Sequence, residues 1–320
     1  MTWLTDTFAT DFMMRALVGG VLVATICALV GTWVVIRGMA FLGEAMAHGT
    51  LPGVAAASLL GVPAILGAAL SATVMSLGVS FVSRRGKLSH DTSIGLLFVG
   101  MLSLGVIIVS HSQSFAVDLT AILFGDVLAI TSTDLIVLLV ALGVTLTLTI
   151  LFHRSFVAAA FDTRVAAVMG MHPRAAHVVL VGLVTLAVVV SYGAVGSLLV
   201  IGLLLAPAVA ASGWSRHIPT IMLVATLFGA ASVLIGLLLS WHAGTAAGAS
   251  IALTAIALAV CSTAARHIIV RSTARSTSTQ KDTCAQTPPI DAPSISHGLL
   301  PAGHDIPASD GVRASAGHER

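Results

Sequence analysis

The sequence predicts an all-α protein that crosses a membrane several times as a bundle of helices. Hydrophobic residues make up 57% of the chain and charged residues only 9%, which is too little charge to cover the surface of a soluble protein of this length. Apolar runs of about 20 residues recur, and each is long enough to cross a hydrocarbon core about 30 Å thick. These runs are continuous rather than alternating, which disfavours a membrane β-barrel.

We expect about nine membrane spans, with eight and ten as the alternatives. In chain order they are expected at residues 13–36, 40–60, 64–82, 92–109, 135–152, two segments within 177–211, 218–239 and 246–265. The apolar stretch 177–211 is too long for one crossing, so we divide it at Gly193 and Gly196. Residues 110–131 contain an apolar run that is too short to cross, and they favour a re-entrant or surface-lying hairpin.

The basic residues indicate the direction of the spans. With residues 84–87 placed in the cytoplasm, all but one of the 15 Lys and Arg residues fall on the cytoplasmic side, and only Arg15 lies outside. We therefore expect an extracytoplasmic segment 1–12, a permease-like transmembrane domain 13–271, and a cytoplasmic C-terminus. Residues 272–320 are rich in Ser, Thr, Pro and Asp, without a periodic apolar pattern, and are expected to be disordered.

A carboxylate and an imidazole lie inside the second expected span. Glu44 and His48 are four residues apart, so on a helix they share one face. Such side chains are costly inside a bilayer, and both can reach one divalent cation. The alternative is structural, with Glu44 reaching towards the membrane surface and His48 hydrogen-bonded to a neighbouring helix. We predict that this pair forms a metal pathway.

Two features weaken the helix beside this pair. Pro52 has no N–H, so the carbonyl of His48 is expected to lose its helical partner and to accept water, a side chain or an ion instead. Gly49 and Gly53 form a small-xxx-small pair that lets a second helix approach closely. A helix break at Pro52 and Gly53 beside buried polar groups is typical of an ion path.

Two acidic residues fall near the outer end of the expected spans. Asp118 and Asp126 flank the short apolar run within residues 110–131. They could line an outer mouth that attracts cations, or they could cap a short re-entrant helix.

A short helix with both ends marked is expected at residues 160–173, on the cytoplasmic side. Asp162 or Thr163 can cap its start, and Gly170 suits a left-handed stop before Pro173. Its body is small and apolar. Such a helix favours a groove on a protein partner, and the alternative is a helix lying on lipid.

The energy for transport is expected to come from another chain. Lys87 follows a glycine, but Leu88 occupies the position where a phosphate-binding loop has Ser or Thr, and the first glycine is missing. We therefore expect no enzymatic activity. An ion-coupled secondary transporter that uses the buried Glu44 is the alternative function. An intramembrane hydrolase is disfavoured because the sequence has neither HExxH nor GxSxG.

Five motifs in a fixed order resemble the metal-ion permease family of ABC transporters, over residues 12–265. They are Arg37-Gly-Met-Ala-Phe-Leu-Gly-Glu-Ala-Met-Ala-His-Gly-Thr-Leu-Pro-Gly53, Asp91-Thr-Ser-Ile-Gly95, Asp118-Leu-Thr-Ala-Ile-Leu-Phe-Gly-Asp126, Phe161-Asp with Met169-Gly170, and Gly202-Leu-Leu-Leu-Ala-Pro-Ala208. The resemblance implies a fold similar to the vitamin B12-type importer permeases and a bacterial plasma (inner) membrane location. The family usually has Asp where this chain has Glu44.

The resemblance also implies substrate and partners. The family imports manganese, zinc or iron as the transported ion, with no permanently bound cofactor. It works as a permease homodimer in the lipid bilayer, with two cytoplasmic ABC ATPase subunits and an extracytoplasmic metal-binding protein, and no nucleic-acid partner is expected. By resemblance, residues 160–173 are the coupling helix that docks on the ATPase, through Phe161, Asp162, Arg164, Val168 and Gly170.

Overall fold

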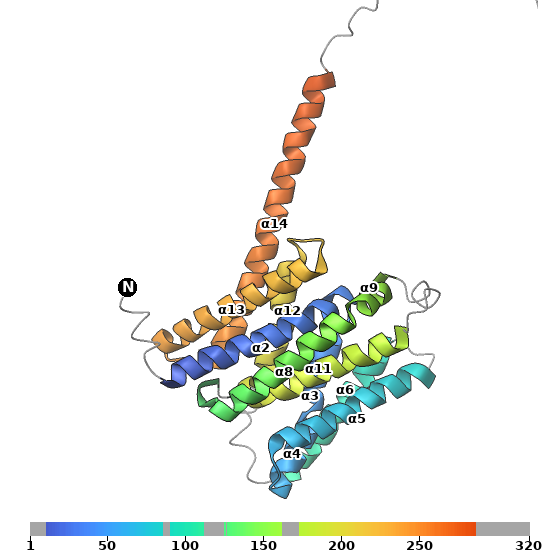
Figure 1. Cartoon of the computed structure of the whole chain (residues 1–320), viewed down its shortest axis with the longest axis vertical. Helices are drawn as coiled ribbons and strands as arrows, with labels where there is room; N and C mark the ends of the chain where they lie inside the picture. The colour runs from blue at the N-terminus through green and yellow to red at the C-terminus, as the bar shows by residue number, and fades with distance from the viewer. Residues whose placement is uncertain (1–10, 86–89, 112–124, 126, 162–172, 286–320) are drawn as a thin grey trace, which may run out of the picture. The chain divides into compact units, whose positions relative to one another are not determined.

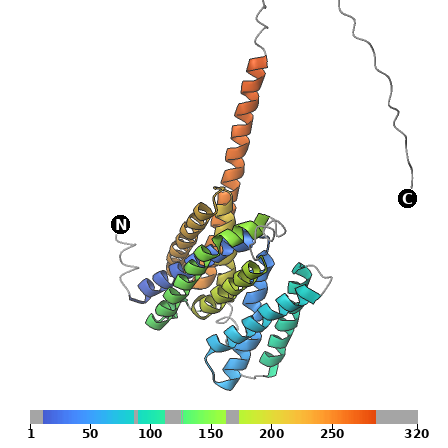
Figure 2. The ribbon, with the colours of Figure 1, turned by 45° about the vertical axis from the view of Figure 1, so that its right-hand side comes forward.

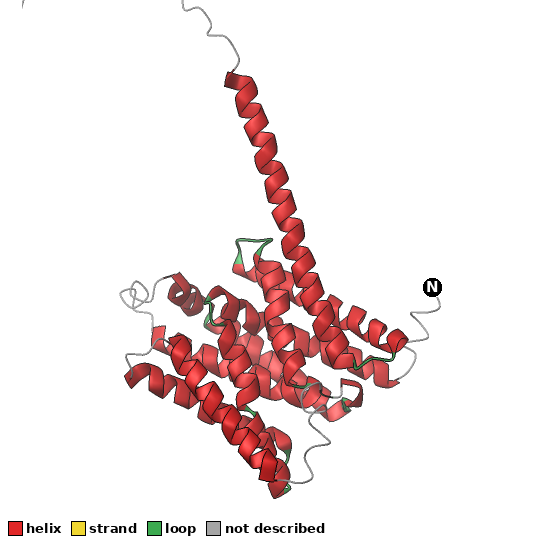
Figure 3. Ribbon diagram, turned by 180° about the vertical axis from the view of Figure 1, so that it is seen from behind, coloured by secondary structure: helices red, strands yellow, loops and turns green. Residues whose placement is uncertain are grey.

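The computed structural model describes residues 11–85, 90–111, 125, 127–161 and 173–285. Every regular element within these residues is a helix, and none is a strand (Figure 3). The predicted all-α, polytopic helical class is therefore confirmed.

Within the described residues, seven helices are long and apolar enough to cross a membrane. They are α2 (Asp11–Ile36), α5 (Ala64–Arg85), α6 (His90–His111), α8 (Ser132–Leu151), α11 (Pro173–Val195), α13 (Ile218–Ala243) and α14 (Ala247–Ala285). The shorter helices are α3 (Ala40–Gly49), α4 (Leu51–Leu60), the 3₁₀ turn η2 (Val127–Ala129), α9 (His153–Phe161) and α12 (Ser197–Ser212). The expected count of about nine spans is not confirmed.

Two expected spans are the source of this difference. The segment 40–60 folds as two ten-residue helices, α3 and α4, that meet at Thr50. The stretch 177–211 divides where we predicted, because Gly196 has φ +76° and separates α11 from α12. α12 has only 16 residues. At about 1.5 Å per residue it is shorter than the hydrocarbon core.

Helix α2 is the centre of the bundle. It lies between α12 and α13 on one side and α8 on the other (Figure 1). Glycines allow the closest contacts: Gly31 lies against the carbonyl oxygen of Leu204 on α12, and Gly20 lies against Val233 on α13. Trp33, near the end of α2, is fully buried. The bundle is thus built around an apolar helix whose residues 19–34 are all buried or half-buried.

The outer helices expose large apolar side chains instead. Leu70 on α5 is 70% exposed and Ile150 on α8 is 68% exposed, with many others of the same kind on α5, α6 and α8. In water such continuous apolar surface would drive aggregation, whereas in a bilayer it meets lipid or another membrane protein. The pattern agrees with a multi-pass membrane protein.

Helices α4, α5 and α6 form a group at one edge of the bundle (Figure 2). The crossing of α4 and α5 is very close. A Cβ added at Gly53 would overlap the carbonyl oxygen of Gly67 and come within 2.6 Å of Ser71 Cβ, and one added at Gly67 would overlap the carbonyl oxygen of Gly53. The predicted close approach at Gly53 is therefore confirmed, with α5 as the second helix.

We expect the substitution Gly53→Ala to lower the melting temperature of the detergent-solubilised protein. The added methyl meets backbone atoms of α5, which no side-chain rotation can move away, and such overpacking typically costs about 1–3 kcal/mol. Gly143→Ala on α8 is the matched control, because no atom lies within 4 Å of its added Cβ. Equal melting temperatures for Gly53→Ala and wild type would contradict the close crossing.

The chain divides into two compact units, Met1–Ser272 and Thr273–Arg320. Helix α14 continues to Ala285, whereas we expected the last span to end near Ala265 and residues from 272 to be disordered. Residues 273–285 are therefore helical in the structure. Residues 286–320 lie outside the described part of the chain, as do residues 1–10 of the expected N-terminal segment.

Candidate functional site

The predicted polar pair lies on α3, in a helix that is otherwise buried. Leu42, Ala45, Met46 and Ala47 are all fully buried against the core of the bundle. Glu44 and His48 are only half-buried, so they lie on the one face of α3 that the rest of this chain does not cover. Neither side chain has a recorded hydrogen bond or ion pair with another described residue. Among the described residues, the pair is thus half-buried and without a polar partner.

Phenylalanine rings border the pair. The ring of Phe98 on α6 packs edge-on against the imidazole of His48, with ring centroids 5.8 Å apart. The same ring packs edge-on against Phe41, one turn before Glu44, at 5.6 Å. These contacts hold α3 against α6 and place an apolar wall beside His48. An apolar wall lowers the local dielectric, which strengthens the attraction between Glu44 and a cation.

The helix break follows His48 directly. Thr50 ends α3, and Pro52 lies in the first turn of α4, where its missing N–H costs nothing. The carbonyl oxygen of Gly49 accepts a hydrogen bond from Ser71 Oγ of α5 at 2.6 Å. The carbonyl of His48 accepts the N–H of Thr50. Two short helices meet at Thr50, next to Pro52, and the carbonyls that accept side-chain donors belong to Ala47 and Gly49 rather than to His48.

Close packing on two sides holds this break. Gly49 of α3 lies against the sulfur of Met75 on α5, so a larger residue in place of Gly49 would push the two helices apart. On α6, a Cβ added at Gly105 would come within 3.3 Å of the backbone nitrogen of Pro52. The end of α3 is therefore fixed between α5 and α6, which positions His48 without covering it.

The two side chains can supply one carboxylate and one imidazole to a cation. The residues that the structure describes contain no group of three or more His, Cys, Asp or Glu side chains placed to hold a metal ion. A divalent ion at this pair would keep water or take ligands from elsewhere to complete its coordination. Such an incomplete site suits an ion that passes through, because a closed set of ligands would retain it.

Several predicted site residues cannot be placed. Asp118 and Asp126 of the expected outer mouth lie outside the described residues, as do Asp162, Arg164, Val168 and Gly170 of the expected coupling helix. Phe161 is the last residue of α9, and Pro173 is the first residue of α11. The ends of the two helices that flank the expected coupling segment are therefore known.

Sequence reasoning missed Ser71 and Phe98. Ser71 lies four residues after Gly67, so a second small-xxx-small pair on α5 was visible in the sequence and could have indicated the partner of Gly53. Nothing in the sequence indicated that Phe98 meets His48, because α3 and α6 are brought together only by the tertiary packing.

A family model, curated relatives and a solved structure all match most of this chain. Residues 9–266 match the family described as the ABC 3 transport family. The manganese transport system membrane protein MntC of Listeria monocytogenes is 34% identical over 245 residues, covering 77% of this chain and 87% of that protein. A probable iron transport system membrane protein of Haemophilus influenzae is 33% identical over 269 residues, covering 84% and 99%. In the solved structures, PsaBC from Streptococcus pneumoniae in complex with Fab has a TM-score of 0.72 at 29% identity, covering 82% of this chain and 94% of that chain.

Proposed function

Because this chain belongs to the ABC 3 transport family, we propose that it is the membrane permease of an importer that carries a divalent transition-metal ion, manganese first among them, into the cytoplasm. Zinc and iron are the competing ions. The half-buried, unpartnered pair of Glu44 and His48 beside the α3–α4 break carries the proposal.

The chain is a transport subunit rather than an enzyme, and ATP hydrolysis belongs to separate ATPase subunits. This agrees with the missing phosphate-binding loop in its own sequence. Membership of an ABC transport family also sets aside the alternative of an ion-coupled secondary transporter.

The donor set supports a transition metal. One carboxylate and one imidazole combine oxygen and nitrogen ligands, which suits manganese, iron and zinc, whereas magnesium and calcium prefer oxygen alone. Relatives named MntC and ScaB are manganese transport proteins, whereas three other relatives are named for iron or chelated iron. The carboxylate of Glu44 supplies the negative charge that offsets the cost of bringing a divalent cation into a low dielectric.

We propose that a second copy of the permease completes the assembly, with two cytoplasmic ATPases and an extracytoplasmic metal-binding protein. The uncovered face of α3 supports this, because a second Glu44 and His48 across a two-fold axis would bring the ligands to four. The chain would lie in a bacterial inner membrane with its N-terminus outside and its C-terminus in the cytoplasm, as its basic residues predict.

Metal content of cells tests the proposed function. Cells that lack this protein, grown at limiting manganese, are expected to contain less manganese than cells that express it, with magnesium content unchanged as the control. The measurement is elemental analysis by mass spectrometry, with iron and zinc read from the same samples. Equal manganese, iron and zinc in the two strains would contradict the proposal.

A further inference from the structure

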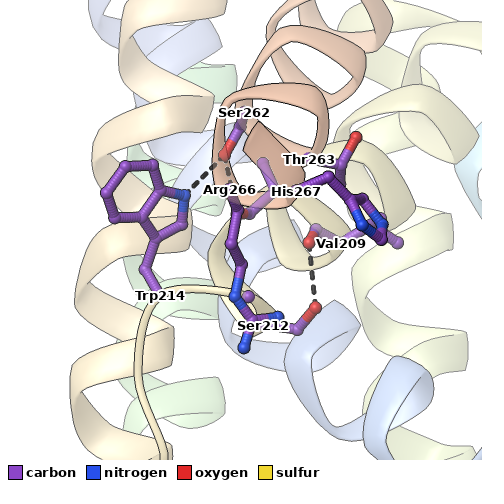
Figure 4. A pocket seen from close by; sticks show the side chains of 9 residues that line it. Val209, Ser212, Trp214, Ser262, Thr263, Arg266 and His267 are labelled. Carbon is purple, nitrogen blue, oxygen red and sulfur yellow. Dashed lines mark hydrogen bonds between the residues drawn. The ribbon is translucent and has the colours of Figure 1, made fainter. Parts of the chain in front are cut away.

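A cavity of about 300 Å³, with both apolar and polar residues in its lining, lies where the end of α12 and the loop after it meet α14 (Figure 4). Its polar lining comes from Ser212 and Trp214 on the loop side and from Ser262, Arg266 and His267 on α14. These residues are far from Glu44 and His48 in the sequence and belong to other helices, so the transport site does not account for them.

Hydrogen bonds hold the two walls of this cavity together. The indole N–H of Trp214 donates to Ser262 Oγ at 2.7 Å, and Ser262 Oγ donates to the carbonyl oxygen of Ala210 at 3.0 Å (Figure 4). Ser262 is 6% exposed, and its hydrogen bond to Ala210 is buried, whereas the one from Trp214 is part-buried. The loop after α12 is thereby fixed against α14, and the cavity has a defined shape.

Gly213 has no side chain, which leaves room for the side chain of Arg266. A Cβ added at Gly213 would come within 2.8 Å of Arg266 Cδ and 3.2 Å of its Nη1. The guanidinium therefore lies along the backbone of the loop, as Figure 4 shows, close to Ser212. No ion pair of Arg266 with another described residue is recorded, and its donors are available to a ligand.

The surrounding sequence offers this arginine no acidic partner. Between Asp162 and Asp282 the chain has no Asp or Glu at all, although Arg216, Arg266 and Arg271 lie in that stretch. A cation held in a shaped cavity without a counter-charge from its own helices attracts an anion from outside. Because guanidinium donors match phosphate oxygens in a two-pronged geometry, phosphate is the anion they suit best.

The cavity lies at the edge of the apolar part of the fold. Arg266 and His267 fall at the end of the candidate span Ala247–Ile269, and Ile268 and Ile269 beside them are 69% and 52% exposed. Trp214 is 53% exposed, and amphipathic indole rings prefer the boundary between lipid and water. A ligand in this cavity would therefore meet phosphate-binding cations with exposed apolar side chains next to them.

We propose that this cavity binds the phosphate group of an anionic phospholipid from the adjacent membrane leaflet. The Arg266 guanidinium donates to the phosphate oxygens, the His267 ring adds an N–H donor, and Trp214 packs on the apolar part of the lipid. The phospholipid and free inorganic phosphate have only the phosphate group in common. The exposed apolar side chains beside the cations favour the lipid.

Native mass spectrometry of the full-length protein tests the proposal. The protein is purified in detergent with equal phosphatidylglycerol and phosphatidylcholine, and the lipids that stay bound are counted. Arg266→Gln is expected to lower phosphatidylglycerol retention about fivefold and to leave phosphatidylcholine retention unchanged. The fivefold figure corresponds to the attraction between one basic residue and an anionic lipid surface. Arg266→Lys keeps the charge without the two-pronged geometry and is expected to retain an intermediate amount.

The matched control is Arg216→Gln, which removes an equal charge from the loop after α12, at a residue that does not line the cavity. It is expected to retain phosphatidylglycerol as wild type does, and an equal loss in both glutamine variants would overturn the proposal in favour of general surface charge. Wild-type retention by a correctly folded Arg266→Gln would also overturn it. Displacement of the lipid by millimolar inorganic phosphate would assign the cavity to free phosphate and reject the lipid.

Discussion

Manganese uptake is expected to fall at least about tenfold when His48 is replaced by alanine or Glu44 by glutamine. Mutating a residue that only supports a metal ligand already costs about tenfold in metal affinity or activity, so loss of a ligand itself should cost at least as much. Glu44→Gln keeps the size of the side chain but removes the charge that attracts a divalent cation. His48→Ala removes the nitrogen ligand that favours transition metals. Glu44→Asp keeps the carboxylate and is expected to retain much of the uptake. Radioactive manganese uptake by cells that express each variant is the measurement.

Each variant must also insert in the membrane and co-purify with its ATPase, because a misfolded subunit would also lose transport. His217→Ala is the matched histidine control, since His217 is exposed on the loop before α13 and lies outside the site. If cells with His48→Ala accumulated manganese, zinc and iron at wild-type levels, the pair would have a structural role and the proposed pathway would be wrong.

The parts of this site that depend on local sequence could be predicted. Pro52 marks a helix break because its ring removes a backbone donor wherever it occurs, and Gly53 permits a close crossing because it has no Cβ. Gly196 divides two helices for a similar reason, since its positive φ is open mainly to glycine. These are properties of single residues, so they need no knowledge of the tertiary structure.

The parts that depend on distant residues could not be predicted. Ser71 donates to the carbonyl of Gly49 across 22 positions of sequence, and the ring of Phe98 meets His48 only because α3 packs on α6. The span count was also uncertain for a physical reason. Hydropathy sums apolar character over a window, so it treats residues 40–60 as one run and cannot show that Thr50 divides them into two short helices.

Helix α14 shows a different limit. Its last residues, beyond Ala265, include many Ser, Thr, Arg and Lys residues without a periodic apolar pattern, and we took that composition as a sign of disorder. Helical conformation needs no burial where the backbone hydrogen bonds are satisfied along the chain and Ala, Arg, Gln and Lys favour it. Composition alone therefore underestimated the length of this helix.

The base of the expected coupling segment is firmly attached to the central helix. Phe156 of α9 is fully buried, and its ring lies 5.1 Å from that of Trp33 on α2, which also packs edge-on against His153 at 5.6 Å. Helix α9 then ends at Phe161, and α11 begins at Pro173. A partner that binds residues 162–172 would thus act on α2, the helix at the centre of the bundle, through this aromatic contact.

We expect the double substitution Arg164→Glu with Val168→Asp to abolish co-purification of the ATPase subunit. These changes place two negative charges in a segment whose body is small and apolar. Burying an unpaired charge in a protein interface costs several kcal/mol, about enough to lose a complex of ordinary affinity. Affinity purification of the tagged permease, with the bound ATPase measured by immunoblot, gives the result. Membrane insertion is expected to be normal, since neither residue belongs to an expected span.

Arg216→Glu is the control for reversing a basic charge, because it does so in the loop between α12 and α13 and leaves residues 162–172 unchanged. It is expected to co-purify with the ATPase as wild type does. The buried contacts of Trp33, His153 and Phe156 do not involve the substituted residues, so the bundle should keep its melting temperature in both variants. If the double variant co-purified with its ATPase at wild-type yield, the ATPase would dock elsewhere on this subunit.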